Sequence, residues 1–171
     1  PIVHFNEVCT EDISYESSYS DEYNAGISLK SIELFSKQGS LKKAFDFNYD
    51  YFTSPNYSDK PHLRKRLKLL SVTDRFDPSF EYYLDYYSNP IAVIGSYAQD
   101  YFGFYNGVES NTTLVPEYLP DATFGTGTHL PGADRRPNAY YMLGGQLNSI
   151  TYPTGGKSVF HFSPHAVPPD T

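Results

Sequence analysis

The chain has 171 residues and a net charge of −7, and its length is sufficient for one domain with a core of its own. The negative charge argues against nucleic acid as the main partner, because phosphate binding needs clustered cations. No apolar run approaches the roughly 18 residues that a membrane-spanning helix needs, so we expect no membrane insertion. Cys9 is the single cysteine, which excludes an intramolecular disulfide and a cysteine-based zinc site.

Residues 1–26 begin with the alternating stretch Ile2-Val3-His4-Phe5 and then become acidic and rich in Ser and Tyr. This pattern predicts a short strand followed by a solvated acidic loop. Because the chain begins at Pro1 and shows no signal peptide, we expect it to be a piece of a longer protein.

Residues 27–87 give the clearest strand signal. Aromatic side chains stand at every second position in one segment, namely at Phe45, Phe47, Tyr49 and Tyr51. Small or polar residues separate them. This period of two predicts a half-buried strand, and the turn at Gly39 before it predicts a β-hairpin.

A second hairpin is predicted from residues 64–76 and 80–86, joined by a turn at Asp77-Pro78. Its first strand has apolar residues at consecutive positions. We expect Leu67 and Leu69 on one face and Leu70 and Val72 on the other, so that both faces of this strand are covered.

Residues 88–144 lose the alternation and are punctuated by Gly and Pro, which predicts a long irregular insertion. One helical turn is predicted within it at 137–143, ended by Gly144-Gly145. Residues 145–163 predict a last hairpin with its turn at 153–156, and residues 164–171 predict a fraying tail. The predicted fold is mainly β, with antiparallel hairpins in an open twisted sheet or part of a β-shell.

The sequence predicts no enzyme, cofactor or metal site. His161 and His165 are four residues apart, but a strand pattern and Pro164 surround them and no third ligand is evident. Catalysis would require at least two residues of a scattered set to meet in one pocket. That set is Asp100, His129, His161 and Glu81.

The aromatic residues leave a different function open. Tyr and Phe make 17% of the chain, and one cluster lies in the irregular insertion. Tyr stacks on sugar rings while its hydroxyl stays hydrated. A carbohydrate-binding module is therefore the alternative, with glycan as partner and with Tyr101, Phe102, Phe104 and Tyr105 as the binding residues.

The last hairpin has a familiar sequence. It runs Gly145-Gln146-Leu147-Asn148-Ser149-Ile150-Thr151-Tyr152-Pro153-Thr154-Gly155-Gly156, followed by Val159-Phe160-His161-Phe162. This segment resembles a YD-type repeat of the rearrangement-hotspot (RHS) family. Its repeat positions are Gly145, Leu147, Ile150, Thr151, Tyr152, Pro153, Gly155, Gly156, Phe160 and Phe162.

Further blocks resemble large surface proteins of the same family from Bacteroidetes bacteria. They are residues 29–33 with 45–52 and 66–73, and Asp100-Tyr101-Phe102-Gly103-Phe104-Tyr105-Asn106-Gly107, which is similar to an Asp-His-Trp-Gly-Tyr-Tyr-Asn-Gly block. Tyr101 and Phe102 replace the usual His and Trp, which argues against chemistry there. The family's Asp-Pro-x-Gly closing sequence is absent, which places this chain upstream of the processing site and toxin.

The resemblance implies a structural role. In RHS proteins, YD hairpins join edge to edge into a spiralling sheet that forms a shell around a C-terminal effector. The chain would then be a bacterial segment, cell-surface or secreted, with neighbouring repeats of its own parent chain as partners. Isolated from them, it is expected to self-associate through its sheet edges.

Overall fold

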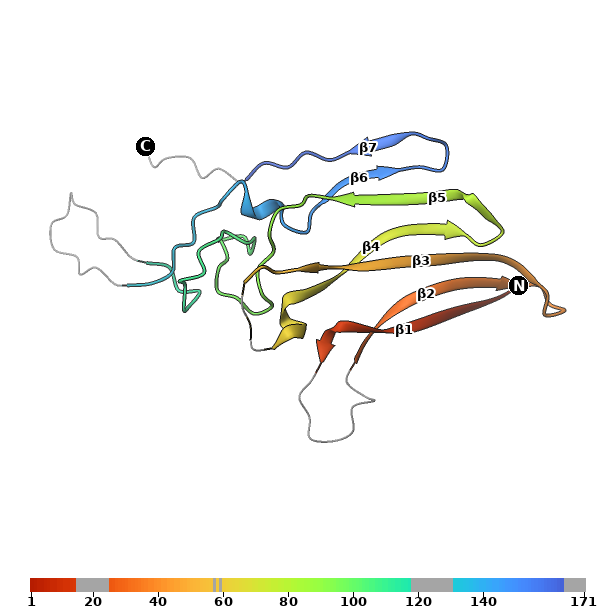
Figure 1. Ribbon diagram of the computed structural model, residues 1–171, viewed down its shortest axis with the longest axis horizontal. Helices are drawn as coiled ribbons and strands as arrows, with labels where there is room; N and C mark the ends of the chain where they lie inside the picture. The colour runs from red at the N-terminus through yellow and green to blue at the C-terminus, as the bar shows by residue number, and fades with distance from the viewer. Residues whose placement is uncertain (15–24, 57, 59, 118–130, 165–171) are drawn as a thin grey trace, which may run out of the picture.

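The computed structural model describes residues 1–14, 25–56, 58, 60–117 and 131–164. Seven strands follow one another in chain order as one antiparallel sheet (Figure 1). They are β1 (Ile2–Ser14), β2 (Ala25–Phe35), β3 (Leu41–Thr53), β4 (Lys65–Asp74), β5 (Asp77–Tyr86), β6 (Leu147–Thr151) and β7 (Lys157–Val159). This confirms the predicted mainly β fold with an open sheet.

The register of the strands gives the sheet one apolar and one polar face, since residues directly opposite each other share a face. The apolar face includes the pairs Ile32–Phe45, Phe47–Val72 and Leu84–Ile150. The polar face includes Ser31–Asp46, Thr73–Glu81 and Asp85–Ser149. The alternation in the sequence therefore sorts side chains between the two faces as predicted.

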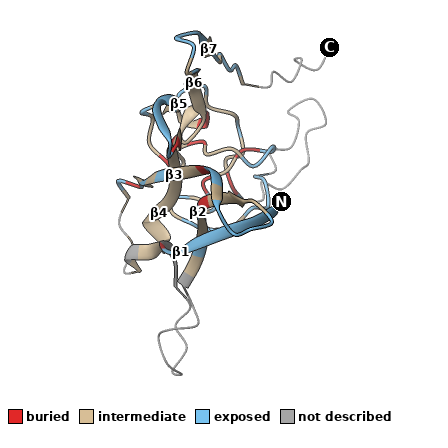
Figure 2. Cartoon of the chain, turned by 90° about the vertical axis from the view of Figure 1, so that its right-hand side faces the viewer, coloured by how far each residue is buried: buried red, intermediate tan, exposed pale blue. Residues whose placement is uncertain are grey.

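Few of the described side chains are buried, and those on the strands are small or polar (Figure 2). Ala44 is fully buried, whereas Phe45, Phe47, Tyr49 and Tyr51 on the same strand are only half-buried. The sheet thus leaves much of its large apolar surface partly exposed to solvent.

One turn and the length of one strand differ from the predictions. The turn between β4 and β5 is formed by Arg75 and Phe76, because Asp74 pairs with Asp77, which begins β5. The Asp74 carboxylate accepts a hydrogen bond from the Phe76 amide at 3.0 Å and stabilises this earlier turn. In addition, β1 is a 13-residue strand and not a short one.

The predicted faces of β4 are also wrong. Tyr49 pairs with Leu69 and Phe47 pairs with Val72, so Leu70 is an extra residue in a β-bulge. Because Phe47 and Tyr49 lie on one face of β3, Leu69 and Val72 share a face too. The consecutive apolar residues therefore come from the bulge and not from coverage of both faces.

The irregular segment between β5 and β6 lies at one end of the sheet, as predicted for an insertion (Figure 1). It contains the isolated bridges Gln99–Tyr105 and Pro116–Ala133. The predicted helical turn is the 3₁₀ helix η3 (Tyr141–Leu143), and Gly145, with a φ of 77°, adopts the left-handed conformation behind it. A second 3₁₀ helix, η2 (Pro61–Arg64), precedes β4. Residues 15–24 of the predicted acidic loop and residues 165–171 of the predicted tail lie outside the described residues.

Candidate functional site

The Asp100–Gly107 block forms a braced turn. The buried Asp100 carboxylate accepts hydrogen bonds from the amides of Phe102 at 2.8 Å and Phe104 at 3.0 Å. The buried Asn106 side chain donates to the Asp134 carbonyl at 2.8 Å and accepts from the Val108 amide at 3.1 Å. Both polar side chains therefore hold the backbone of the insertion in place.

The aromatic residues of this block have different surroundings. Tyr101 is 58% exposed, and its ring lies 5.6 Å from the Arg135 guanidinium carbon. Phe102 is 50% exposed and Phe104 is half-buried. Tyr105 points inward and makes an edge-on contact with Tyr141, with ring centroids 5.0 Å apart. A single stacking platform made of all four residues is therefore not formed.

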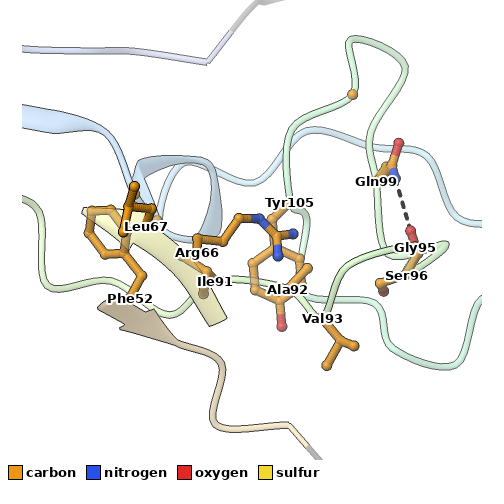
Figure 3. Close-up of a pocket in the computed structure, with 13 residues that line it drawn as sticks. Phe52, Arg66, Leu67, Ile91, Ala92, Val93, Gly95, Ser96, Gln99 and Tyr105 are labelled. Atoms are coloured by element: carbon orange, nitrogen blue, oxygen red, sulfur yellow. Dashed lines mark hydrogen bonds between the residues drawn. The ribbon is translucent and has the colours of Figure 1, made fainter. Parts of the chain in front are cut away.

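Tyr105 lines a cavity of about 380 Å³ between the insertion and the sheet (Figure 3). The other walls include Phe52, Arg66, Ile91 and Gln99. Asn56 donates a hydrogen bond to the Tyr105 hydroxyl at 3.1 Å. Burial, together with the nearby Glu109 carboxylate, raises the pKa of Tyr105 to about 12. The hydroxyl therefore stays neutral, and the cavity combines aromatic walls with polar groups and the Arg66 cation.

The last segment forms the hairpin β6–β7, with its turn at 153–156. Leu147, Ile150 and Thr151 lie in β6, and the Tyr152 amide donates to the Gly156 carbonyl at 2.8 Å to close the turn. Gly155 has a φ of 82°, which only glycine adopts without strain. After β7, the Phe160 amide donates to the Asn148 carbonyl at 2.9 Å, and the Phe162 ring lies 6.2 Å from that of Tyr87.

The same local geometry occurs three times across the sheet. In each of the hairpins β1–β2, β3–β4 and β5–β6, the second strand carries one extra residue in a bulge. The three extra residues are Lys30, Leu70 and Asn148. Each is the variable residue of a Leu-x-Ser-(Ile/Val) sequence, found at 29–32, 69–72 and 147–150.

The serine of each sequence is buried opposite an Asn or Asp. Ser31, Ser71 and Ser149 are 2%, 4% and 1% exposed. They pair with Asn6, Asn48 and Asp85 respectively. Asn6 donates to the Ser31 hydroxyl at 2.9 Å, and Asn48 donates to the Ser71 hydroxyl at 2.9 Å.

The third hairpin varies this arrangement. Asp85 accepts its hydrogen bond from the bulged Asn148 at 3.0 Å instead of bonding to the serine. The buried Ser149 hydroxyl has no hydrogen-bond partner within the described residues. The small size of serine is thus common to all three bulges, whereas its hydrogen bond is not.

Tyrosines join each hairpin to the preceding one. Tyr49 follows Asn48, and its hydroxyl donates to the carbonyl of Leu29 at 2.9 Å. Tyr86 follows Asp85, and its hydroxyl donates to the carbonyl of Leu69 at 2.8 Å. Burial raises the pKa of both tyrosines, which keeps them protonated as donors. Each acceptor is the leucine of the Leu-x-Ser sequence in the hairpin before.

An ion-pair group stabilises the β4–β5 turn. The Arg75 guanidinium contacts Glu33 at 2.5 Å and Asp46 at 2.6 Å, and Lys43 contacts Asp74 at 2.9 Å. Hydrogen bonds from Arg75 lower the pKa of Glu33 and Asp46, and a hydrogen bond from Lys43 lowers that of Asp74. These charges connect β2, β3 and the turn.

The residues considered for catalysis have separate places in the structure. The Asp100 carboxylate bonds to backbone amides, Glu81 on β5 accepts a hydrogen bond from Thr73 at 3.1 Å, and His161 follows β7. His129 and His165 lie outside the described residues. No group of three or more His, Cys, Asp or Glu that could hold a metal ion occurs within the described part of the chain.

No protein-family model, curated protein or solved structure matches this chain. In the described ranges, no helix is long and apolar enough to cross a membrane. The repeated bulged hairpin is the main regular feature of the described sheet. The YD-like motif covers only the last hairpin and does not indicate this repeat. The threefold Leu-x-Ser-(Ile/Val) sequence is the signal that would have found it.

Proposed function

We propose that this chain is a non-enzymatic structural segment of a large bacterial RHS/YD-repeat protein, either surface-bound or secreted. It forms part of, or leads into, a β-shell around a C-terminal effector. The observation that carries this proposal is the repetition of one bulged hairpin across the sheet. Since each repeat bonds to the one before through a tyrosine, the unit is suited to extension into a longer sheet.

The partial burial of the apolar face supports the same proposal. A domain that works alone normally covers its large apolar side chains, whereas Phe45, Phe47 and Val72 are only half-buried. A shell wall has one face turned toward an enclosed cargo. The half-buried aromatic side chains of β3 supply such a face, and the polar face would be turned to solvent.

The experiment determines the size and location of the native protein. Antibodies against the folded chain are applied to fractions of the bacterium that encodes it, with and without protease treatment of intact cells. We expect a polypeptide far larger than 19.4 kDa that external protease degrades or that appears in the medium. A native product of about this chain's own mass that remains in the cytosol would contradict the proposal.

A second candidate function is carbohydrate binding at the cavity beside Tyr105. It is favoured by the combination of Tyr105, Gln99 and Arg66 in one concave site. Retention on a glycan affinity gel that is lost with Tyr105→Ala, and kept with the exposed control Tyr140→Ala, would support it. The absence of retention on any glycan would contradict it.

A further inference from the structure

The register of the sheet gives β7, together with the residues that follow it, the spacing of a further repeat. Ser31 lies opposite Asp46, Ser71 opposite Tyr83 and Ser149 opposite Val159. Counting two residues on from these partners reaches Asn48, Asp85 and His161. His161 therefore occupies the Asn/Asp position of a further hairpin, and Phe162 occupies the tyrosine position.

The segment from β7 through Phe162 thus has the features of a first strand without its second. β7 is an edge strand in the described sheet, with β6 as its neighbour. Val159 in β7 and Phe162, which lies three residues after it, are both exposed, although β7 already pairs with β6. In the three complete hairpins, the equivalent strand pairs on its outer side with a Leu-x-Ser-(Ile/Val) strand.

We propose that the β7 edge binds an antiparallel Leu-x-Ser-(Ile/Val) strand from a further repeat. Its serine lies opposite His161, its leucine opposite Phe162, and the residue between them bulges. This inference rests on the proposed structural role and adds the sequence and register of the partner. Binding is by main-chain hydrogen bonds, with the bulge setting the register.

The other edge is less suited to the same partner. Glu7 stands in β1 where Tyr49 and Tyr86 stand in β3 and β5, because it follows the Asn that pairs with the buried serine. Those tyrosines donate to the leucine carbonyl of the adjoining Leu-x-Ser strand. A glutamate carboxylate has no proton to donate, and its oxygen atoms would repel the oxygen of that carbonyl. The partner strand is therefore expected at β7.

Register-specific disulfide trapping tests this inference on the full chain. The protein carries Cys9→Ser and His161→Cys, both at exposed positions, and the probe is a synthetic peptide with the sequence of residues 145–152. One peptide has cysteine at the serine position, and control peptides have it at the leucine or the threonine position. A further control lacks the bulged residue. All are incubated in a glutathione redox buffer.

We expect cross-linking at the serine position to be about tenfold faster than at the control positions, because a disulfide forms only between residues held in the correct geometry. Deletion of the bulged residue should remove this preference. Amide hydrogen exchange with the unmodified peptide should slow at residues 157–162 and not in β1. Equal rates for all peptides, or protection of β1 alone, would overturn the inference. A short native protein would contradict the proposed function while leaving this result intact.

Discussion

The hydroxyl of Tyr49 on β3 donates a hydrogen bond of 2.9 Å to the backbone carbonyl of Leu29 on β2. The acceptor belongs to a bulge in the preceding hairpin, where the ladder of main-chain hydrogen bonds is locally interrupted. The side chain thus supplies a partner at the point where the backbone pairing is irregular. Tyr86 makes the equivalent contact to Leu69, so one interaction joins successive repeats twice.

Removing these hydroxyls should destabilise the sheet. Tyr49→Phe and Tyr86→Phe should each lower the free energy of unfolding by about 0.5–1.5 kcal/mol, the usual net contribution of a hydrogen bond. The measurement is urea denaturation followed by circular dichroism. Tyr83→Phe is the matched control, because Tyr83 lies on the polar face and is largely exposed. Equal effects in all three variants would show that the contacts contribute nothing specific.

Replacing the buried serines Ser71 and Ser149 by alanine should change the free energy of unfolding in different directions. Ser71→Ala removes the acceptor of Asn48 and should lower the free energy of unfolding by about 1 kcal/mol. Ser149→Ala removes a buried hydroxyl that has no partner within the described residues, so its free energy of unfolding should stay level or rise. The measurement is the urea concentration at the unfolding midpoint of both variants and of the unaltered chain. A larger loss in Ser149→Ala than in Ser71→Ala would contradict it.

A methyl group at Gly107 should disrupt the braced turn. A Cβ there would clash with the Tyr141 ring, and the φ of 79° disfavours any side chain. Gly39→Ala is the control, since Gly39 has the same φ but open space around it. Both variants should lose about 1–3 kcal/mol from backbone strain, and only Gly107→Ala should lose more from the clash. Thermal unfolding of both proteins measures the difference.

The ion pairs around Arg75 should make the fold sensitive to acid. The folded pKa values of Glu33, Asp46 and Asp74 are lowered from ordinary values of 4.5, 3.8 and 3.8. Their stabilisation is complete above these values and is lost as the pH falls through the lower folded values. When the pH is below about 4, the protein should therefore unfold at a lower denaturant concentration. Arg75→Met should flatten this dependence for Glu33 and Asp46, and an unchanged pH profile would contradict the assignment.

The isolated chain should self-associate through its β1 edge. Phe5 is 63% exposed on this edge strand, and Ile2, Val3 and Val8 are also exposed. Phe5→Lys should reduce the mass measured by light scattering at high protein concentration, because a charged edge disfavours strand pairing. Lys42→Gln, at an exposed position away from β1, is the control. Strictly monomeric behaviour of the unaltered chain would refute this prediction.

The amino-acid sequence alone indicates most of the strands and the hairpins β2–β3, β4–β5 and β6–β7, but it does not indicate the order of the strands in the sheet. Period-two alternation at Phe45–Tyr51 and glycine at the turn positions are local signals, and local sterics are enough to read them. The turn at Arg75-Phe76 was misplaced because the Asp74 side chain, and not Pro78, stabilises it. The prediction that Leu70 and Val72 share a face is wrong, because the extra residue Leu70 shifts the alternation and places Val72 on the same face as Leu69.

The relation between the hairpins depends on contacts that form in the folded sheet. The contacts from Tyr49 to Leu29 and from Asn48 to Ser71 join residues about 20 positions apart, and their pairing depends on register. Likewise, the aromatic cluster looked continuous in sequence, yet the brace from Asp100 turns Tyr105 inward while Tyr101 stays exposed. Sequence gives each residue its chemical properties, whereas long-range register decides which of them meet, because a shift of one residue moves a side chain to the other face.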